Sequence, residues 1–258
     1  MNAPVLSLRG VSKSYGAVRA LVGVDLDVHA HEVVAVVGDN GAGKSTLAGV
    51  VSGALLPDTG HVERDGRPVH LVNPAVARAH GIAAVFQDLA LCENLDVVEN
   101  IFLGQEVTQG PLLDEVAMEK HAWELLNQLA ARVPSVRAPV GALSGGQRQA
   151  VAIARSLLGD PRVVVLDEPT ASLGITQTAE VLNLIERLRE RGHGVVLISH
   201  SMADVQAVAD RIVVLRLGRV NGDFDAASTS YEDLIAAVTG VTPSGRSGRA
   251  VRADEASR

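Results

Sequence analysis

The sequence predicts an α/β fold in which helices cover both faces of a mostly parallel sheet. Short, mostly apolar runs rich in β-branched residues recur along the chain, at 32–37, 82–86, 163–167 and 195–198. Segments with helical periodicity separate these runs, which is the pattern of a buried parallel sheet. Between about residues 88 and 155 the strand pattern stops and only helical patterns remain. This stretch predicts an all-helical subdomain inserted into the α/β frame.

The composition fits one large domain or a core with a subdomain. The 258 residues are 47% hydrophobic and only 2% aromatic, so the core must be aliphatic. The net charge of −7 argues against a nucleic-acid partner, because such partners usually require a basic stripe. The single cysteine, Cys92, excludes an internal disulfide, and we interpret it as a small packed side chain.

The N-terminal third predicts β structure around the first buried run. Residues 5–8 and 24–28 alternate between apolar and polar side chains and predict half-exposed strands. Residues 61–69 predict a hairpin, because an Asp-Gly pair at their centre favours a two-residue turn. A short helix is predicted at 73–81, where an Asn-Pro pair begins the helix and a glycine ends it.

The rest of the chain predicts further helices and a second hairpin. The hairpin spans 212–223 and turns at a Leu-Gly pair, and the predicted helices cover 97–103, 114–132, 144–158, 176–191, a segment beginning at 201, and 230–238. We assign these elements to one domain over 1–241, with its core at about 1–87 and 156–241 and its helical subdomain at about 88–155. Residues 242–258 contain few apolar side chains and predict a disordered tail.

The stretch GDNGAGKST, residues 38–46, has the P-loop pattern of Gly, four residues, Gly, Lys and Ser. It follows an apolar strand pattern and opens a helical one. Its glycines allow backbone N–H groups to face phosphate oxygens, and the helix N-terminus adds partial positive charge. The pattern places Lys44 at the β- and γ-phosphates and Ser45 at Mg²⁺. The predicted nucleotide-binding residues of this loop are Gly38, Asn40, Gly41, Gly43, Lys44, Ser45 and Thr46.

A pair of acids follows the buried run VVVL at 163–166. Carboxylates at the C-terminal end of a parallel strand lie at the ligand edge of the sheet. Asp167 can hold Mg²⁺, and Glu168 can polarise an attacking water as a general base. The alternative is a strand that merely ends in two solvated acids. The P-loop earlier in the chain favours a nucleotide site instead.

The segment LSGGQ, residues 143–147, predicts a second anion site. A hydroxyl and two glycines at the start of a helix present bare N–H groups to a ligand. A plain helix cap is the alternative explanation. The predicted ligand-binding residues are Ser144, Gly145, Gly146 and Gln147.

The P-loop, LSGGQ and the later LDEPT together resemble the ATP-binding subunit of an ABC (ATP-binding cassette) transporter, over residues 6–240. This resemblance implies a P-loop NTPase core, an N-terminal antiparallel β subdomain and the inserted helical subdomain, with ATP and Mg²⁺ as cofactors. It also implies that Tyr15 stacks on adenine and that Gln87 lies near Mg²⁺ and the attacking water. His200 matches the histidine that contacts the γ-phosphate, and with Glu168 and Gln87 it forms the implied catalytic set.

The resemblance further implies a homodimer in which two subunits pack head to tail, so that Ser144–Gln147 of one covers the P-loop of the other.

One segment departs from the family. It reads Ala171-Ser172-Leu173-Gly174 where the family usually has Ser-Ala-Leu-Asp. Gly174 therefore lacks a carboxylate, and we expect weaker communication between the two sites. Hydrolysis is still expected, because Glu168 and His200 are present.

A narrower resemblance, at FQDLALCENLDVVENIFLGQE and EPTASLG, points to the monosaccharide-importer branch. It implies ATP hydrolysis that powers sugar import, membrane permease subunits as partners, and an extracytoplasmic sugar-binding protein. No apolar run reaches the ~18 residues of a transmembrane helix, and the N-terminus lacks a secretion-signal pattern. We therefore expect a soluble subunit held by the permease at the cytoplasmic face of the cell membrane. An ABC motor for another substrate, or a soluble ABC ATPase acting on ribosomes or DNA, remains an alternative.

Overall fold

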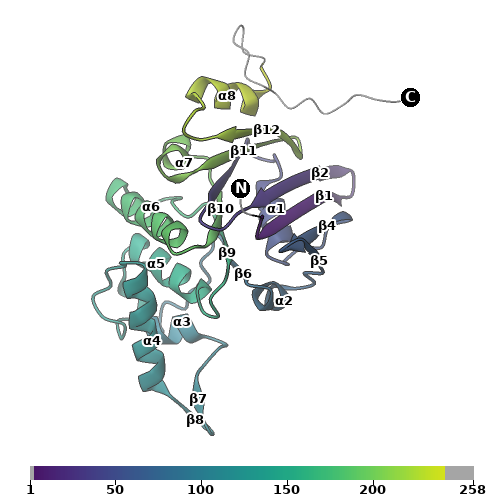
Figure 1. The fold of residues 1–258 in the computed structure, drawn as a ribbon. Helices are drawn as coiled ribbons and strands as arrows, with labels where there is room; N and C mark the ends of the chain where they lie inside the picture. The colour runs from purple at the N-terminus through teal and green to yellow at the C-terminus, as the bar shows by residue number, and fades with distance from the viewer. Residues whose placement is uncertain (1–2, 242–258) are drawn as a thin grey trace.

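A computed structural model describes residues 3–241, and the predicted tail at 242–258 lies outside the described residues. Its centre is a six-stranded sheet with the order β12-β11-β3-β10-β9-β6 (Figure 1). Every neighbouring pair is parallel except β11 with β12, which confirms the mostly parallel prediction. The strands are β3 (Val33–Val37), β6 (Ile82–Val85), β9 (Val163–Asp167), β10 (Gly194–Ile198), β11 (Arg211–Arg216) and β12 (Arg219–Asp225).

The central strands are apolar throughout because both faces of the sheet are covered. On one face, Val163 and Val165 join a core with α1 (Lys44–Val51) and with strands of the N-terminal sheet. On the other face, Val164 and Leu166 join a core with α5 (Gly145–Ser156) and α6 (Ile175–Glu190). Adjacent residues of β9 thus enter different cores, which is why its pattern does not alternate.

The N-terminal sheet is antiparallel, with the order β2-β1-β4-β5. Its strands are β1 (Leu6–Tyr15), β2 (Val18–Val28), β4 (Thr59–Arg64) and β5 (Arg67–Val69). β1 and β2 are much longer than the strands predicted at 5–8 and 24–28. The register between β1 and β2 shifts after Leu8, and Gly10 has a φ of 59°. This irregularity interrupts the alternation of apolar and polar residues from which a strand is predicted.

The helical lobe contains α3 (Val97–Phe102), α4 (Glu115–Gln128) and α5, which pack around fully buried Ile101, Leu126 and Ile153. In Figure 1 this lobe extends below the sheet. The expectation of an all-helical insertion is corrected in one detail, because β7 (Thr108–Gln109) and β8 (Leu112–Leu113) form a short hairpin. Strands of two residues leave no detectable sequence pattern, so this hairpin could not be predicted.

The remaining helices begin directly after residues whose side chains cap them. The side chain of Asn73 accepts a hydrogen bond of 2.9 Å from the N–H of Val76 and begins the predicted short helix. These helices are α2 (Pro74–Ala79), α7 (Met202–Val208) and α8 (Tyr231–Thr239), with a 3₁₀ turn at Val140–Ala142. Within residues 3–241, no helix combines the length and apolar character needed to cross a membrane.

Candidate functional site

The P-loop joins the end of β3 to the start of α1 with a tightly packed backbone. Gly38 and Gly43 have φ values of 150° and 109°, which favour glycine. A side chain at Gly38 would collide with the carbonyl of Leu215, and one at Gly43 with the carbonyl of Ala20. The loop is therefore packed against two other segments, and its glycines are required by geometry as well as by a ligand.

Lys44 lies inside this loop. Its ammonium group donates hydrogen bonds to the carbonyl oxygens of Gly38, at 2.7 Å, and Asp39, at 3.2 Å. The residue is only 8% exposed. These contacts hold a positive charge at the centre of the predicted phosphate cradle, while Ser45 is exposed at the first turn of α1.

Asp167 ends β9 and is 8% exposed. Among residues 3–241, its Oδ1 atom is a buried side-chain oxygen without a hydrogen-bond partner. Burial raises the pKa of Asp167, the neighbouring charge of Glu168 raises this pKa further, and the charge of Lys44 lowers it. A buried carboxylate oxygen without a donor is a costly arrangement, and binding of a cation would relieve the cost.

The residues present therefore fit a magnesium ion that is bound together with a phosphate ligand. No group of three or more His, Cys, Asp or Glu side chains within the described part of the chain could hold a metal by itself. Mg²⁺ usually takes one or two carboxylates together with water and substrate phosphates. The single buried carboxylate of Asp167 and the exposed hydroxyl of Ser45 match that requirement.

Glu168 and His200 meet at the end of two neighbouring strands. Glu168 follows β9 and His200 follows β10, and these strands pair in parallel with Asp167 opposite Ile198. The backbone N–H of Glu168 donates to the carbonyl of Ile198 at 2.9 Å. The Nδ1 atom of His200 lies 2.7 Å from Oε2 of Glu168, with side-chain exposures of 68% and 15%. The structure thus brings together two residues that the sequence predicts for catalysis.

Gln87 follows another strand of the central sheet, whereas Tyr15 lies in the N-terminal sheet. Gln87 is exposed just beyond β6, which pairs with β9. Tyr15 ends β1, is 48% exposed, and has the Lys13 ammonium 6.0 Å from its ring centroid. Neither side chain is enclosed, so both are accessible to a ligand.

Residues 144–147 form the N-terminus of α5 and are held by their own hydrogen bonds. The N–H of Gln147 donates to Ser144 Oγ at 3.2 Å, and the N–H of Ser144 donates to Gln147 Oε1 at 2.9 Å. A side chain on Gly145 would lie 2.7 Å from Leu173, and one on Gly146 would lie 2.8 Å from Glu180. The two glycines thus leave room for the ends of the Leu173 and Glu180 side chains. The two hydrogen bonds form the helix cap that the sequence offered as the alternative to an anion site.

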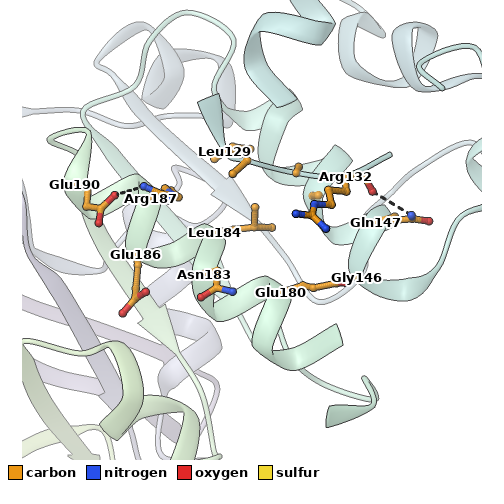
Figure 2. Close-up of a pocket in the computed structure, with 13 residues that line it drawn as sticks. Leu129, Arg132, Gly146, Gln147, Glu180, Asn183, Leu184, Glu186, Arg187 and Glu190 are labelled. Carbon is orange, nitrogen blue, oxygen red and sulfur yellow. Dashed lines mark hydrogen bonds and ion pairs between the residues drawn. The ribbon is translucent and has the colours of Figure 1, made fainter. Parts of the chain in front are cut away.

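A groove beneath residues 144–147 was missed in the sequence. It has a volume of about 470 Å³ and is lined by residues 129–132 and by parts of α5 and α6 (Figure 2). The side chain of Gln147 crosses one end and donates to the carbonyl of Arg132 at 3.0 Å. The small residues Gly146 and Ala150 on the α6-facing side of α5 are the signal that could have predicted it.

The segment at 171–174, which departs from the usual family sequence, lies directly before α6. Gly174 is the N-cap, with φ −74° and ψ 165°, and no atom would lie within 4 Å of an added side chain. Ile175 follows and is 93% exposed. The segment therefore has room for the carboxylate that the family usually carries here.

Comparisons with known proteins agree with this geometry. A family model described as ABC transporter matches residues 21–171. The chain is 42% identical over 245 residues to the fructose import ATP-binding protein FrcA of Rhizobium meliloti, covering 92% of this chain and 94% of that protein. It is 41% identical to the xylose/arabinose import ATP-binding protein XylG of Sulfolobus acidocaldarius, covering 91% and 94%. It is also 40% identical to the ribose import ATP-binding protein RbsA 2 of Burkholderia pseudomallei, over 94% of this chain and 48% of that protein.

Solved structures show the same fold. A nucleotide-free ATP-binding cassette from an ABC transporter superposes with a TM-score of 0.77 and 26% identity, covering 92% of this chain and 95% of that chain. A dimeric cassette in a post-hydrolysis state, bound to ADP and phosphate, superposes with a TM-score of 0.73 and 28% identity, covering 86% and 98%. Members of this family bind ATP and hydrolyse it to power transport. The family model, these relatives and the shared fold show that the chain belongs to the ABC transporter family, as an ATP-binding domain.

Proposed function

We propose that this protein is the ATP-hydrolysing motor subunit of an ABC importer for a monosaccharide. The observation that carries the hydrolytic part is the 2.7 Å contact of Glu168 with His200, next to buried Asp167. The relatives named above are import ATP-binding proteins for fructose, xylose or arabinose, and ribose, which supports a monosaccharide as the cargo.

Nucleotide binding in this proposal begins at the P-loop. Its backbone N–H groups and Lys44 hold the phosphates, and Tyr15 stacks on the adenine. Ser45, Asp167 and Gln87 would hold Mg²⁺, which would supply positive charge against the phosphates. The buried, unpartnered oxygen of Asp167 supports this assignment.

Glu168 acts as the general base in hydrolysis. Its carboxylate accepts a proton from the attacking water, and His200 positions that carboxylate while its exposed ring contacts the γ-phosphate. Gln87 orients the same water from the end of β6. The general base thus comes from β9 and its positioning residue from β10, so strand pairing fixes their relative geometry.

A second copy of the chain completes the site. Residues 144–147 of that copy cover the phosphates held by the first, as the family resemblance implies. The dimeric cassette of known structure supports the formation of a dimer. The partners are membrane permease subunits and, indirectly, an extracytoplasmic sugar-binding protein. The subunit thereby lies at the cytoplasmic face of the cell membrane.

The test is ATPase activity of the chain reconstituted with its permease and binding protein. Fructose, xylose, arabinose and ribose are added one at a time, with a disaccharide as the control for general sugar effects. We expect one monosaccharide to stimulate phosphate release and the disaccharide to have no effect. Activity without stimulation by any monosaccharide would contradict the import assignment, and the absence of any ATPase activity would contradict the motor assignment.

A further inference from the structure

A short hydrogen bond joins the turn after β9 to the helix after β10. The hydroxyl of Thr170 donates to Oδ2 of Asp204 at 2.6 Å, although 34 positions separate the two residues. Thr170 lies just beyond Glu168 in the chain, and Asp204 lies in the first turn of α7, just beyond His200. The bond therefore connects the two segments that carry the proposed catalytic pair, from outside that pair.

The turn on the β9 side, residues 168–172, is strained on both sides of Thr170. Glu168 has a φ of 52° and Ser172 a φ of 62°, in the left-handed region that disfavours residues with a side chain. Within the turn, the N–H of Ala171 donates to the carbonyl of Glu168 at 3.1 Å. Strained backbone persists only where the surrounding structure holds it in place. This turn therefore needs anchors outside itself.

The segment on the β10 side is held by its own short-range hydrogen bonds. His200 lies between Ser199, which is buried, and Ser201, whose N–H donates to Ser199 Oγ at 3.0 Å. Ser201 is the N-cap of α7, and its Oγ accepts a hydrogen bond of 3.4 Å from the N–H of Asp204. Asp204 is thus tied to the backbone that carries His200. An anchor on the Asp204 carboxylate is therefore an anchor on that backbone.

Three contacts join these two segments along their length. The N–H of Glu168 donates to the carbonyl of Ile198 at 2.9 Å, where the strands end. The side chains of Glu168 and His200 meet at 2.7 Å, but the His200 side chain is 68% exposed, so packing does not hold its ring. The bond between Thr170 and Asp204 closes the far end. Without it, the other two contacts would hold the turn at one end only.

The chemistry of this bond favours a defined position. A length of 2.6 Å lies in the range of a charge-assisted O–H···O bond, which is stronger than a bond between neutral groups. Both side chains are half-buried. Asp204 forms no ion pair within residues 3–241, so the Thr170 hydroxyl is its side-chain partner there. A carboxylate that meets a hydroxyl instead of a cation supplies orientation without neutralising a charge.

We propose that Thr170 and Asp204 are positioning residues for ATP hydrolysis. Their hydrogen bond holds the strained turn against α7 and thereby fixes the carboxylate of Glu168 relative to the ring of His200. Neither Thr170 nor Asp204 is assigned a contact with nucleotide or with Mg²⁺. The inference rests on the proposed function, because it requires that Glu168 and His200 act in hydrolysis. The competing explanation is that the bond merely attaches α7 to the rest of the fold.

The test compares variants of the full chain that remove the bond or keep it. Thr170→Val keeps the shape of the side chain but loses the hydroxyl, whereas Thr170→Ser keeps the hydroxyl. Asp204→Ala removes the acceptor, and combining it with Thr170→Val completes a double-mutant cycle. Ser7→Ala is the matched control. The Ser7 hydroxyl also donates to a carboxylate at 2.6 Å, that of Asp27, but between two strands of the N-terminal sheet.

ATP affinity is measured by calorimetric titration, kcat by phosphate release from the chain reconstituted with its permease, and stability by thermal unfolding. We expect Thr170→Val to bind ATP within about twofold of wild type but to lose at least about tenfold in kcat, because a small misplacement of a reacting group costs up to about 10²-fold. Thr170→Ser should stay within about threefold of wild type. The double variant should lose no more than Thr170→Val alone. Ser7→Ala should keep the wild-type kcat even if its Tm falls as far as that of Thr170→Val.

A second measurement follows the catalytic pair without turnover. The nitrogen NMR signal of His200 Nδ1, assigned by its absence in His200→Ala, reports the contact of the ring with Glu168. Glu168→Gln gives the signal expected when that carboxylate is lost. In Thr170→Val the signal should move toward its position in Glu168→Gln, and in Ser7→Ala it should not move. Absence of ATPase activity in the wild-type complex would contradict the proposed function, whereas this signal tests the positioning by itself.

Three results would overturn the inference. One is a kcat of Thr170→Val equal to that of wild type. Another is an equal loss in Thr170→Val and Ser7→Ala, which would show a general effect of lower stability. The third is a His200 signal in Thr170→Val that matches wild type. If Thr170→Val does not fold, Asp204→Ala is measured in its place, and the same three results in that variant reject the proposal.

Discussion

Nδ1 of His200 lies 2.7 Å from Oε2 of Glu168, although 32 positions separate the two residues in the sequence. Two adjacent parallel strands end at this point, and the register of β9 and β10 sets the separation of the side chains. The histidine is mostly exposed and the glutamate mostly buried. The pair therefore combines a carboxylate shielded from water with a ring that a ligand can reach.

The first prediction concerns His200. His200→Ala is expected to reduce kcat by about 10²-fold, because Glu168 loses its orienting partner and a positioned proton-transfer group contributes about 10²–10⁴. The Kd for ATP, measured by titration, should change by no more than about twofold. His61→Ala is the matched control, since His61 also contacts a glutamate at 3.0 Å but on β4 of the N-terminal sheet. An unchanged kcat in His200→Ala would show that the contact has no catalytic role.

The second prediction concerns Lys44. Lys44→Ala should weaken ATP binding by about 10- to 100-fold, because each hydrogen bond to a charged group contributes about 1.5–3 kcal/mol. Lys120→Ala serves as the control, because the Lys120 side chain is 79% exposed on α4. Calorimetric titration with ATP measures both, and equal affinity in the two variants would remove Lys44 from the phosphate site.

The third prediction concerns the departure at Gly174. Gly174→Asp should fold normally, because the backbone is extended and the position is open. As an N-cap, aspartate should also stabilise α6 by a few tenths of a kcal/mol relative to glycine. Restoring the family's acid should raise the Hill coefficient for ATP hydrolysis, whereas Gly174→Ala, which adds no carboxylate, should not. A Hill coefficient that is the same in all three proteins would show that residue 174 does not link the sites.

The fourth prediction follows from the raised pKa of Asp167. A carboxyl whose pKa is higher in the folded state binds its proton more tightly there, so its contribution to stability falls as pH rises above the ordinary carboxyl pKa of about 3.9. Asp167→Asn should therefore raise the Tm of the nucleotide-free protein at about pH 7.5. This gain should be smaller at about pH 4.5, where the wild-type carboxyl is partly protonated.

Thermal unfolding at both pH values measures this difference. Asp204→Asn is the control, because Asp204 accepts a 2.6 Å hydrogen bond from Thr170 and so is not left without a partner. A gain in Tm that is independent of pH would show that the charge of Asp167 does not reduce the stability of the folded protein.

The sequence predicted the buried strands because they depend on short-range patterns. The roles of Glu168 and His200 in catalysis stay predictions, and that of His200 came from the family resemblance. β3, β9 and β10 are apolar at every position or nearly so, and the acids and histidine that follow them mark the ligand edge. The length of β1 could not be predicted, because its outer half is polar and its register is irregular. The guanidinium of Arg155 donates hydrogen bonds to the carbonyl oxygens of Ala90 and Leu89, which lie 65 and 66 positions away, and nothing local in either segment indicates the other.

The side chains that lie beside Gly145 and Gly146 could not be predicted for a related reason. The ligand pattern of these glycines is visible in five consecutive residues, whereas the approach of Leu173 and Glu180 appears only when the elements assemble. The predicted phosphate role of residues 144–147 remains a prediction.

The most direct test of the central claim is the rate of phosphate release from Mg²⁺-ATP by wild type and by Glu168→Gln, measured beside ATP affinity. Glu190→Gln, an exposed site on the same chain, is the control for a simple loss of charge. We predict that Glu168→Gln binds ATP at least as tightly as wild type, accumulates as an ATP-bound dimer, and turns over about 10²- to 10⁴-fold more slowly. Turnover by Glu168→Gln at the wild-type rate would contradict the assignment of Glu168 as the general base.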